Sequence, residues 1–330
     1  MTGAPRRLAL VAVAVALLVV AACSTDSTGP GAATASTAPT ATAAPAPAAS
    51  DDCHGLPPTA SYPPLGALPP ANQMPAGSHM RAIQDKGKLT VGVSADTLLF
   101  GAQNPLTNRI EGFDIDMLRL VARAIFGPDG GDKLDIKVIT YAQRIPSLQS
   151  RAVDLVAHTM TINCTRWNQI GFSSEYYHAG QKVLVRSDSP SRSIEELDRA
   201  GAKVCAPKGS TNIDNLALYQ GVKPVAVDDI TDCLVLFQQG KVDAITADDT
   251  VLAGFADQDP FAAVVGGAFT DEPYGIGANA EDVDLIQFVN RVLANARTGG
   301  EWKDIYATWL GEFGPTPEPP AAEAQLRPLP

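Results

Sequence analysis

Polar and charged side chains follow a predicted strand at a point where they could bind a small ionic ligand. Thr159, Thr161 and Arg166 come at or just after the end of the strand predicted at 154–159. Hydroxyls, backbone N–H groups and a guanidinium together suit a carboxylate, because the guanidinium fork donates two parallel hydrogen bonds to it. The same spacing is also compatible with ordinary strand threonines followed by a solvent-exposed arginine at a helix start.

Two further strand ends carry complementary groups. Ser210 and Thr211 lie in a Lys-Gly-Ser-Thr turn between a predicted strand and a predicted helix, where free backbone N–H groups favour an anion. Either hydroxyl can instead serve as the helix N-cap. Asp248 ends another predicted strand and can receive an ammonium group, whereas we expect its neighbour Asp249 to cap the next helix.

The elements that must position these groups alternate between strands and helices. Short β-branched runs at 89–93 and 136–139 flank a helical pattern at 114–126, and the alternation restarts at Gly180. Such alternation with short loops predicts an α/β fold with mixed, mostly parallel sheets covered by helices on both faces. Two units of similar size, one inserted in the other, would place a ligand cleft between them, outside the carboxyl ends of the strands.

Composition excludes several classes of function. The 330 residues hold 25 Lys+Arg and 36 Asp+Glu, a formal net charge of −11, and there is no basic stretch. Nucleic-acid binding is carried by clustered lysines and arginines, so we expect no nucleic-acid partner. No cysteine has the close Cys/Cys or Cys/His spacing of a metal site, and we expect neither a metal nor a cofactor.

Both ends of the chain differ from the middle. Two arginines precede the apolar run 8–22, whose 15 residues fall short of the roughly 20 that span a bilayer as a helix. Residues 1–22 are therefore predicted to be an export signal. Cys23 follows Val-Ala-Ala, which resembles the lipobox of bacterial lipoproteins, where the cysteine thiol carries diacylglycerol; an ordinary signal peptide with an incidental cysteine is the alternative. The Ala-, Thr- and Pro-rich stretch 23–78 is predicted to be a disordered tether, and 314–330 a disordered tail.

Four cysteines remain besides Cys23, and in an exported chain they predict two disulfides with three possible pairings. Cys205 ends a predicted strand and Cys233 opens a predicted helix in the same stretch of chain. We therefore pair these two, which leaves Cys53 with Cys164.

Several short motifs, taken in chain order, resemble those of the family 3 solute-binding proteins of ABC importers for polar amino acids. The resemblance runs from about Gly87 to Leu310. Its motifs are Gly-Phe-Asp-Ile-Asp at 112–116, Thr-Met-Thr-Ile at 159–162 followed by Arg166, Phe-Ser at 172–173, Gly-Ser-Thr at 209–211 and Ala-Asp at 247–248.

The resemblance implies a two-lobed periplasmic-binding-protein fold of type II with a hinged cleft. We expect 79–185 and 274–313 to form the first lobe and 186–273 the second. The chain would cross between the lobes near 185–187 and 272–275.

The resemblance also implies the roles of the site residues. Arg166 binds the α-carboxylate of an amino acid with Thr161 and Thr211, and Asp248 binds the α-ammonium with help from the Thr159 carbonyl. In the glutamate- and aspartate-binding members a stretch similar to 141–149 carries an arginine that grips the distal carboxylate, and we assign that role to Arg144; a surface arginine at a helix start is the alternative.

Three neighbouring residues leave alternatives open. Phe100 could wall the pocket or belong to the core, and His158 could donate to the ligand or be a satisfied structural histidine. Asp96 stands where some members of this branch carry a second arginine. An aspartate there would repel a distal carboxylate and favour an amide, so glutamine and asparagine remain open as ligands.

The function implied is capture of a polar, acidic L-amino acid by a monomeric, lipid-anchored protein at the extracytoplasmic face of the cell membrane, for delivery to an ABC permease. A lipoprotein that presents the amino acid to a membrane sensor is the alternative. Some dehydratases resemble the same fold, but the nearby candidates for a general acid or base, Glu175, His158 and Asp96, form no recognisable pair. We therefore expect no enzymatic activity.

Overall fold

The computed structural model describes residues 53–322 and 324–330. The predicted export signal, Cys23 and the tether up to residue 52 lie outside the described residues. In the part of the chain that is described, no helix combines the length and the apolar character that crossing a bilayer requires.

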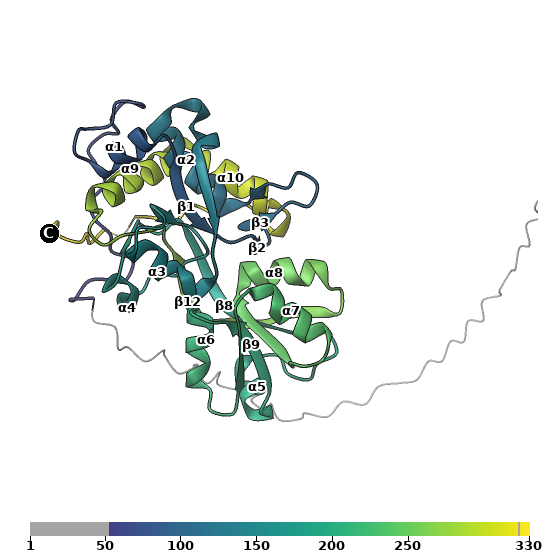
Figure 1. Cartoon of the computed structure of the whole chain (residues 1–330). Coiled ribbons are helices and arrows are strands. Elements are labelled where there is room, and N and C mark those ends of the chain that lie inside the picture. Colours follow the sequence, from purple (N-terminus) through teal and green to yellow (C-terminus); the bar gives the residue numbers. More distant parts are fainter. Residues whose placement is uncertain (1–52, 323) are drawn as a thin grey trace, which may run out of the picture. The chain divides into compact units, whose positions relative to one another are not determined.

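The first lobe is built on a sheet in the strand order β5-β1-β6-β13-β7. Figure 1 shows β1 of this sheet beside α2 (Phe113–Phe126). All five residues of β1 are buried, which is typical of a parallel strand covered on both faces. β1 runs parallel to β5 and β6, whereas β13 is antiparallel to β6 and β7. Its strands are β1 (Leu89–Val93), β5 (Leu134–Val138), β6 (Leu155–Val156), β7 (Gly171–Phe172) and β13 (Gly277–Ala278), with a small sheet of β2 (Asp96–Thr97), β3 (Gly101–Gln103) and β4 (Ile110–Glu111) beside them.

Helices of the first lobe come from both ends of the described chain. They are α1 (His79–Lys86), α2 (Phe113–Phe126), α3 (Arg144–Gln149), α4 (Cys164–Trp167), α9 (Val283–Gly299) and α10 (Glu301–Leu310). The apolar stripe of α2 includes Ile115, Leu118 and Val121, all fully buried, so this face of the helix packs into the core. At the entrance to α2, rings from several elements cluster around Phe113.

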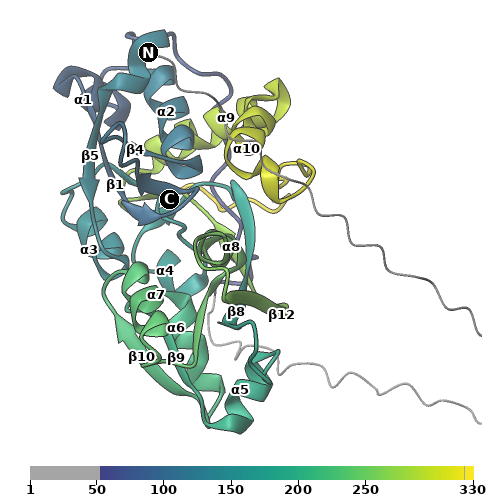
Figure 2. The same ribbon diagram turned by 90° about the vertical axis from the view of Figure 1, so that its right-hand side faces the viewer.

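The second lobe is built on a sheet in the order β10-β9-β11-β8-β12. Its strands are β8 (Tyr177–Arg186), β9 (Lys203–Pro207), β10 (Lys223–Val227), β11 (Ala244–Asp248) and β12 (Ala262–Tyr274), and its helices are α5 (Ile194–Ala200), α6 (Thr211–Asn215), α7 (Ile230–Gln238) and α8 (Asp249–Gln258). Figure 2 shows α5, α6 and α7 beside β9 and β10. The two lobes together confirm the predicted α/β class with mixed, mostly parallel sheets.

The chain crosses between the lobes along two antiparallel strands. Residues 177–180 of β8 pair with 271–274 of β12 alone, whereas from Gln181 onward β8 also pairs with β11 inside the second sheet. The crossovers therefore lie at 177–180 and 271–274. The second was predicted at this place. The first was placed too late, near 185–187, because one uninterrupted strand serves both as crossover and as sheet strand.

Both predicted cysteine pairs are bonded. Cys205 joins Cys233 within the second lobe, and Cys53 joins Cys164 across 111 residues of sequence. The second bond brings the start of the described chain onto α4 of the first lobe.

The prediction of disorder is wrong for residues 53–78 and for part of the tail. Ala60, Ser61 and Met74 are buried in the first lobe, and Arg327 of the tail donates from its backbone N–H to the Ser61 carbonyl at 2.9 Å. The composition argument fails here because a few fixed points, above all the Cys53–Cys164 bond, replace the broad apolar surface that these segments lack.

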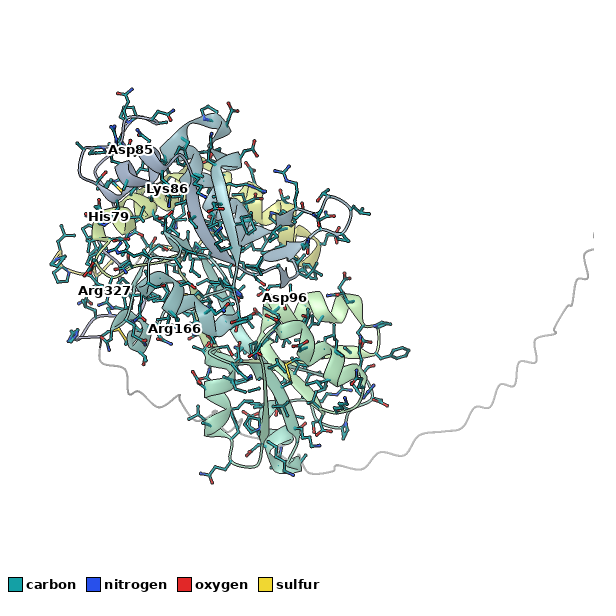
Figure 3. The ribbon with its side chains drawn as sticks, in the orientation of Figure 1. His79, Asp85, Lys86, Asp96, Arg166 and Arg327 are labelled. Atoms are coloured by element: carbon teal, nitrogen blue, oxygen red, sulfur yellow. A yellow bond between two sulfur atoms is a disulfide. The ribbon has the colours of Figure 1, made fainter. Side chains whose placement is uncertain are left out.

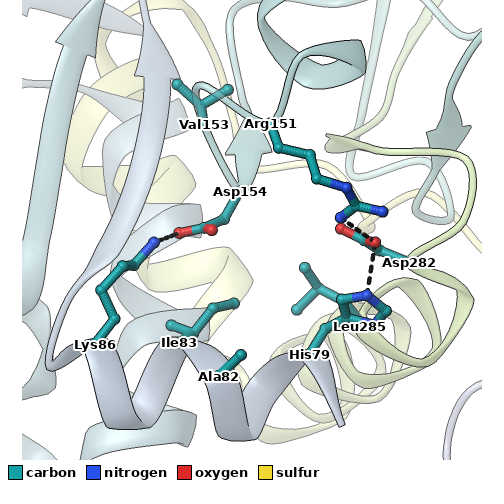
Figure 4. A pocket seen from close by; sticks show the side chains of 9 residues that line it. All are labelled: His79, Ala82, Ile83, Lys86, Arg151, Val153, Asp154, Asp282 and Leu285. Atoms are coloured by element: carbon teal, nitrogen blue, oxygen red, sulfur yellow. Dashed lines mark hydrogen bonds and ion pairs between the residues drawn. The ribbon is translucent and has the colours of Figure 1, made fainter.

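Ion pairs tie α1 to the rest of the first lobe around a surface pocket of about 180 Å³ (Figure 4). Lys86 lies 2.6 Å from Asp154, and Asp282 lies 2.9 Å from His79 and 2.6 Å from Arg151. The side chains of Lys86, His79 and Arg151 are all more than a third exposed, so these contacts fix the geometry of α1 more than they add stability.

Candidate functional site

The predicted site residues converge where the carboxyl ends of strands from both lobes meet. Thr161 and Arg166 follow β6 of the first lobe, while Thr211 and Asp248 come from the second. The Thr161 and Thr211 hydroxyl oxygens lie 3.2 Å apart, and the Arg166 guanidinium donates to the Gly209 carbonyl at 3.4 Å. Arg166 and Asp248 are 6% and 4% exposed. A buried cation and a buried carboxylate from separate lobes therefore lie near this junction, and the charge of Asp248 raises the pKa of Arg166.

Arg166 has no carboxylate partner within the described residues. Its Nη1 donates to the Thr161 carbonyl at 2.7 Å, and its own backbone N–H donates to the Asn163 side chain, which caps α4. Burial lowers the pKa of the guanidinium, while Glu272 and other nearby carboxylates raise it. A buried cation without an ion-pair partner is suited to an incoming carboxylate.

Thr159 has a strained backbone. Its φ of 42° is unusual for a β-branched residue and is the kind of outlier that clusters at binding sites. The Thr159 N–H donates to Asp114 at 2.8 Å, and the Tyr176 hydroxyl donates to the same carboxyl group at 2.5 Å. Burial raises the pKa of Asp114 to about 7. The Asp of the Gly-Phe-Asp motif thus holds the turn that presents Thr159.

The turn after β9 approaches the first lobe closely. Gly209 has a φ of 72°, and a Cβ placed on it would lie 2.8 Å from the Ala142 Cα, so only glycine fits. Ser210 accepts from the Ile213 N–H at 3.2 Å and donates to the Pro207 carbonyl at 2.7 Å. Of the two predicted hydroxyls in this turn, Ser210 is therefore the N-cap of α6, and Thr211 points to the other lobe.

Asp248 is held by two donors. The Tyr274 hydroxyl donates to one oxygen at 2.5 Å and the Asn212 side chain to the other at 2.7 Å. Burial and, after it, the charge of Glu272 raise the pKa of Asp248 to about 7. Neither Asn212 nor Tyr274 was singled out from the sequence, since nothing in the local pattern distinguishes them from helix and strand residues.

Arg144 is fully buried and donates to backbone carbonyls of both lobes. Its Nε donates to Tyr141 O at 3.0 Å, its Nη1 to His158 O at 3.0 Å and to Thr159 O at 3.3 Å, and its Nη2 to Gly209 O at 3.0 Å. Burial and the charge of Arg166 lower its pKa to about 9. A guanidinium has five N–H donors, so one on Nη2 remains for a ligand.

Three other residues considered in the sequence have defined positions. Phe100 is a core aromatic whose ring lies 5.8 Å from that of Tyr274. Tyr274 in turn donates to Asp248, so Tyr274 lies between Phe100 and that carboxylate. His158 is buried, and its Nε2 lies 3.1 Å from the Ile139 carbonyl, while no partner of its Nδ1 is found within the described residues. Burial lowers the pKa of His158 to about 3, so the ring is neutral.

Asp96 bridges the lobes. One oxygen accepts from the Ser94 hydroxyl at 2.7 Å, and the other accepts from the Thr231 hydroxyl at 2.9 Å and from the Thr231 N–H at 3.3 Å, in the first turn of α7. Figure 3 shows Asp96 in the first lobe above the α7–α8 region. Its charge is thus directed at the start of a helix, where a carboxylate is favourable.

Glu272 is the main site residue that the sequence analysis missed as a binding group. It lies on β12 at the crossover and is 1% exposed. One of its oxygens accepts from both the Thr161 and the Thr211 hydroxyls at 2.6 Å, and the other accepts from Thr270 at 2.7 Å. A cavity of about 530 Å³ reaches these groups from the crossover side. A resident carboxylate thus occupies the two hydroxyls expected to bind a ligand carboxylate.

Comparison with known proteins places this arrangement among amino-acid-binding proteins. Residues 89–312 match the model of the bacterial extracellular solute-binding proteins, family 3. The chain is 36% identical over 234 residues to the ABC transporter glutamine-binding protein GlnH of Bacillus subtilis, covering 71% of this chain and 85% of that protein. It is 31% identical over 246 residues to the glutamate-binding protein GluB of Corynebacterium glutamicum, covering 72% and 83%.

Solved structures give the same picture. Holo ArgBP from T. maritima is similar with a TM-score of 0.61 and 32% identity, over 66% of this chain and 93% of that one. An ancestral arginine-binding protein bound to glutamine is similar with a TM-score of 0.63 and 31% identity, over 68% and 98%. These likenesses agree with the two lobes and the crevice described above.

Proposed function

The chain belongs to the bacterial extracellular solute-binding proteins of family 3 and is an amino-acid-binding protein, not an enzyme; from this premise we propose that its ligand is an acidic L-amino acid, glutamate or aspartate. The observation that carries the proposal is the pair Arg166 and Asp248, both buried and contributed by separate lobes. A guanidinium and a carboxylate on opposite walls suit the two charged ends of one zwitterion.

In this proposal Arg166 binds the α-carboxylate together with the hydroxyls of Thr161 and Thr211. Asp248 binds the α-ammonium, with the Thr159 carbonyl as a second acceptor. Contacts to both lobes at once stabilise the closed form over the open one, because a ligand shifts a two-state equilibrium only by its differential affinity for the two states.

The side chain of the ligand is assigned to Arg144. Among the described residues all hydrogen-bond acceptors of this buried guanidinium are carbonyls, and its second Nη2 N–H is available to a distal carboxylate. Asp96 is the group that favours an amide instead, because its donors Ser94 and Thr231 are neutral and leave its negative charge in place. The amides glutamine and asparagine are the alternative ligands, because the similar protein GlnH of Bacillus subtilis is named a glutamine-binding protein.

The experiment is a thermal-shift panel of the twenty amino acids on the purified chain, followed by calorimetry with glutamate, aspartate, glutamine and asparagine. We expect the largest stabilisation from the two acids, because ligand binding raises stability in proportion to RT ln(1 + [L]/Kd). A larger shift with glutamine and asparagine would mean that the ligand carries a carboxamide, and not a carboxylate, at the end of its side chain. No shift with any amino acid would refute capture by this crevice.

Delivery is proposed to go to an ABC permease, as for the relatives named as ABC transporter proteins. Anchoring through a lipid on Cys23 is part of the proposal, as are the monomeric state and the location at the extracytoplasmic face of the membrane. Cys23→Ala should release the protein from membranes, and capture of partners from solubilised membranes separates a permease from a membrane sensor.

A further inference from the structure

The helix that carries Arg166 is too short to hold itself in place. α4 has four residues, whereas isolated helices shorter than roughly 12 residues are marginal in water. The Asn163 contact of Arg166 belongs to α4 itself, whereas Thr161 is held separately against β12, by its pairing with Tyr274 and its bond to Glu272. Arg166 therefore reaches the Thr161 carbonyl only when α4 is held in the right place. The position of Arg166 relative to the rest of the lobe therefore depends on what holds α4.

A segment at the start of the described chain, residues 53–65, packs on α4; we call it the strap. Cys53 is bonded to Cys164, the first residue of α4. The Trp167 Nε1–H donates to the Pro58 carbonyl at 2.8 Å, and the ring of Tyr62 meets that of Trp167 edge-on at 6.0 Å. The strap thus contacts both the first and the last residue of α4.

The strap is fixed to the first lobe independently of α4. The Ser61 hydroxyl donates to the Phe172 carbonyl at 2.7 Å, and the Asn290 side chain donates to the Tyr62 carbonyl at 2.7 Å. Asn290 belongs to α9, so the strap joins α4 to a long helix of the lobe.

Arg327 of the tail contacts both the strap and α4. The Arg327 guanidinium carbon lies 3.8 Å from the centre of the Trp167 ring, and its Nε–H donates to the Ala60 carbonyl at 2.8 Å. A cation over an aromatic face within 6 Å is attracted to it. Figure 3 shows Arg327 and Arg166 on the same side of the first lobe.

We propose that the strap and Arg327 are positioning elements for ligand binding, which hold α4 so that Arg166 meets the α-carboxylate of the amino acid. This inference rests on the proposed function. Since every amino acid carries that carboxylate, loosening α4 lowers affinity by the same factor for all ligands. The strap and Arg327 thereby set how strongly any amino acid binds, while residues that contact the ligand side chain, such as Arg144, set which amino acid is preferred.

The test uses variants of the purified chain: Cys53→Ser with Cys164→Ser, Arg327→Ala, and Trp167→Phe. The last removes the indole N–H together with the five-membered half of the ring and keeps an aromatic side chain. Its matched control is Trp309→Phe, which removes an indole N–H that donates to Asp116 at 2.7 Å, away from the site. Calorimetry at 25 °C with L-glutamate and with L-glutamine gives Kd, and hydrogen exchange reports the protection of the amides at 164–168.

We expect the double cysteine variant to raise Kd roughly tenfold for both ligands and the other two roughly threefold, with faster exchange at 164–168, since small misplacements of binding groups weaken binding. Trp309→Phe should leave both readouts unchanged. Unchanged Kd in the variants, with normal binding by the parent chain, would overturn the inference and leave the proposed function intact. So would a loss confined to one ligand. Binding of neither ligand by the parent chain would instead refute the proposed function.

A purely stabilising role of the strap is distinguished by the same data. It would lower the melting temperature without moving Kd at 25 °C, and that result overturns the inference. If the double cysteine variant does not fold, Trp167→Phe and Arg327→Ala decide the question, because both leave the Cys53–Cys164 bond in place.

Discussion

Glu272 competes with the ligand for two hydroxyl hydrogens, and Glu272→Gln should therefore tighten binding. A threonine hydroxyl has one hydrogen to donate, and a carboxylate can only accept. The hydroxyls of Thr161 and Thr211 both donate to Glu272 at 2.6 Å. In this arrangement neither hydroxyl has a hydrogen left for an incoming α-carboxylate, which must displace Glu272 to obtain them.

The size of the effect follows from the charge of the acceptor. Hydrogen bonds to a charged group contribute about 1.5–3 kcal/mol, and those between neutral groups about 0.5–1.5 kcal/mol. Replacing the carboxylate by an amide oxygen should ease the displacement of the two bonds by about 2–3 kcal/mol in total, which is roughly 30- to 150-fold in Kd.

Two further consequences of Glu272→Gln act in the same direction. Removal of a negative charge near Arg166 reduces repulsion of the ligand carboxylate. It also lowers the pKa of Asp248, which the charge of Glu272 raises, so more of the protein carries an ionised Asp248 for the ammonium.

Calorimetry with L-glutamate at pH 7 measures the change. The matched control is Glu175→Gln, a second carboxyl group near the crossover, whose partner is His178 at 2.8 Å rather than the threonines. Weaker or unchanged binding by Glu272→Gln would refute the competition and would mean that the carboxylate orients the hydroxyls for the ligand. If Glu272→Gln and Glu175→Gln tightened binding equally, the cause would be the change in net charge and not the release of the two hydroxyls.

Three further predictions concern the charged groups of the crevice. Arg166→Ala should weaken binding by about 3–5 kcal/mol, because it leaves a buried ligand carboxylate unpaired; calorimetry checks it, and Arg151→Ala at the surface pocket should leave Kd unchanged. Arg144→Met should lower the melting temperature, since four carbonyls lose their donor, and should weaken glutamate and aspartate more than their amides; equal weakening of all four would remove Arg144 from the specificity role. The pKa of Asp248 is raised to about 7, so the free protein takes up a proton there as the pH falls below 7, and the association constant should drop by up to about tenfold per pH unit between pH 7 and 5. A flat profile over that range, measured by calorimetry, would contradict the ammonium-binding role of Asp248.

The part of the site that the sequence predicted lies at strand ends. Arg166, Thr161, Thr211 and Asp248 could be grouped because parallel strands in such sheets deliver their carboxyl ends to one edge, so a polar residue just after a β-branched run has a known destination. The resemblance to the family added the assignment of roles. The pairing of the cysteines was also predictable, since one pair lay on neighbouring elements and only one partner remained for the other.

The misses share a physical cause, which is that their contacts join positions far apart in sequence without a local pattern. Glu272 lies on a long strand whose preceding segment is an ordinary edge strand, and its role depends on the other lobe's Thr161, 111 residues away. Residues 53–65 look like a tether because their composition is poor in apolar side chains, yet one disulfide and a cation over Trp167 fix them. Composition predicts what a segment can bury by itself, whereas a covalent bond or a single buried contact decides whether it is fixed to something else. For the same reason, the residues most open to misinterpretation from sequence are those that connect the lobes or cover the site, and Glu272→Gln and Trp167→Phe test these two groups directly.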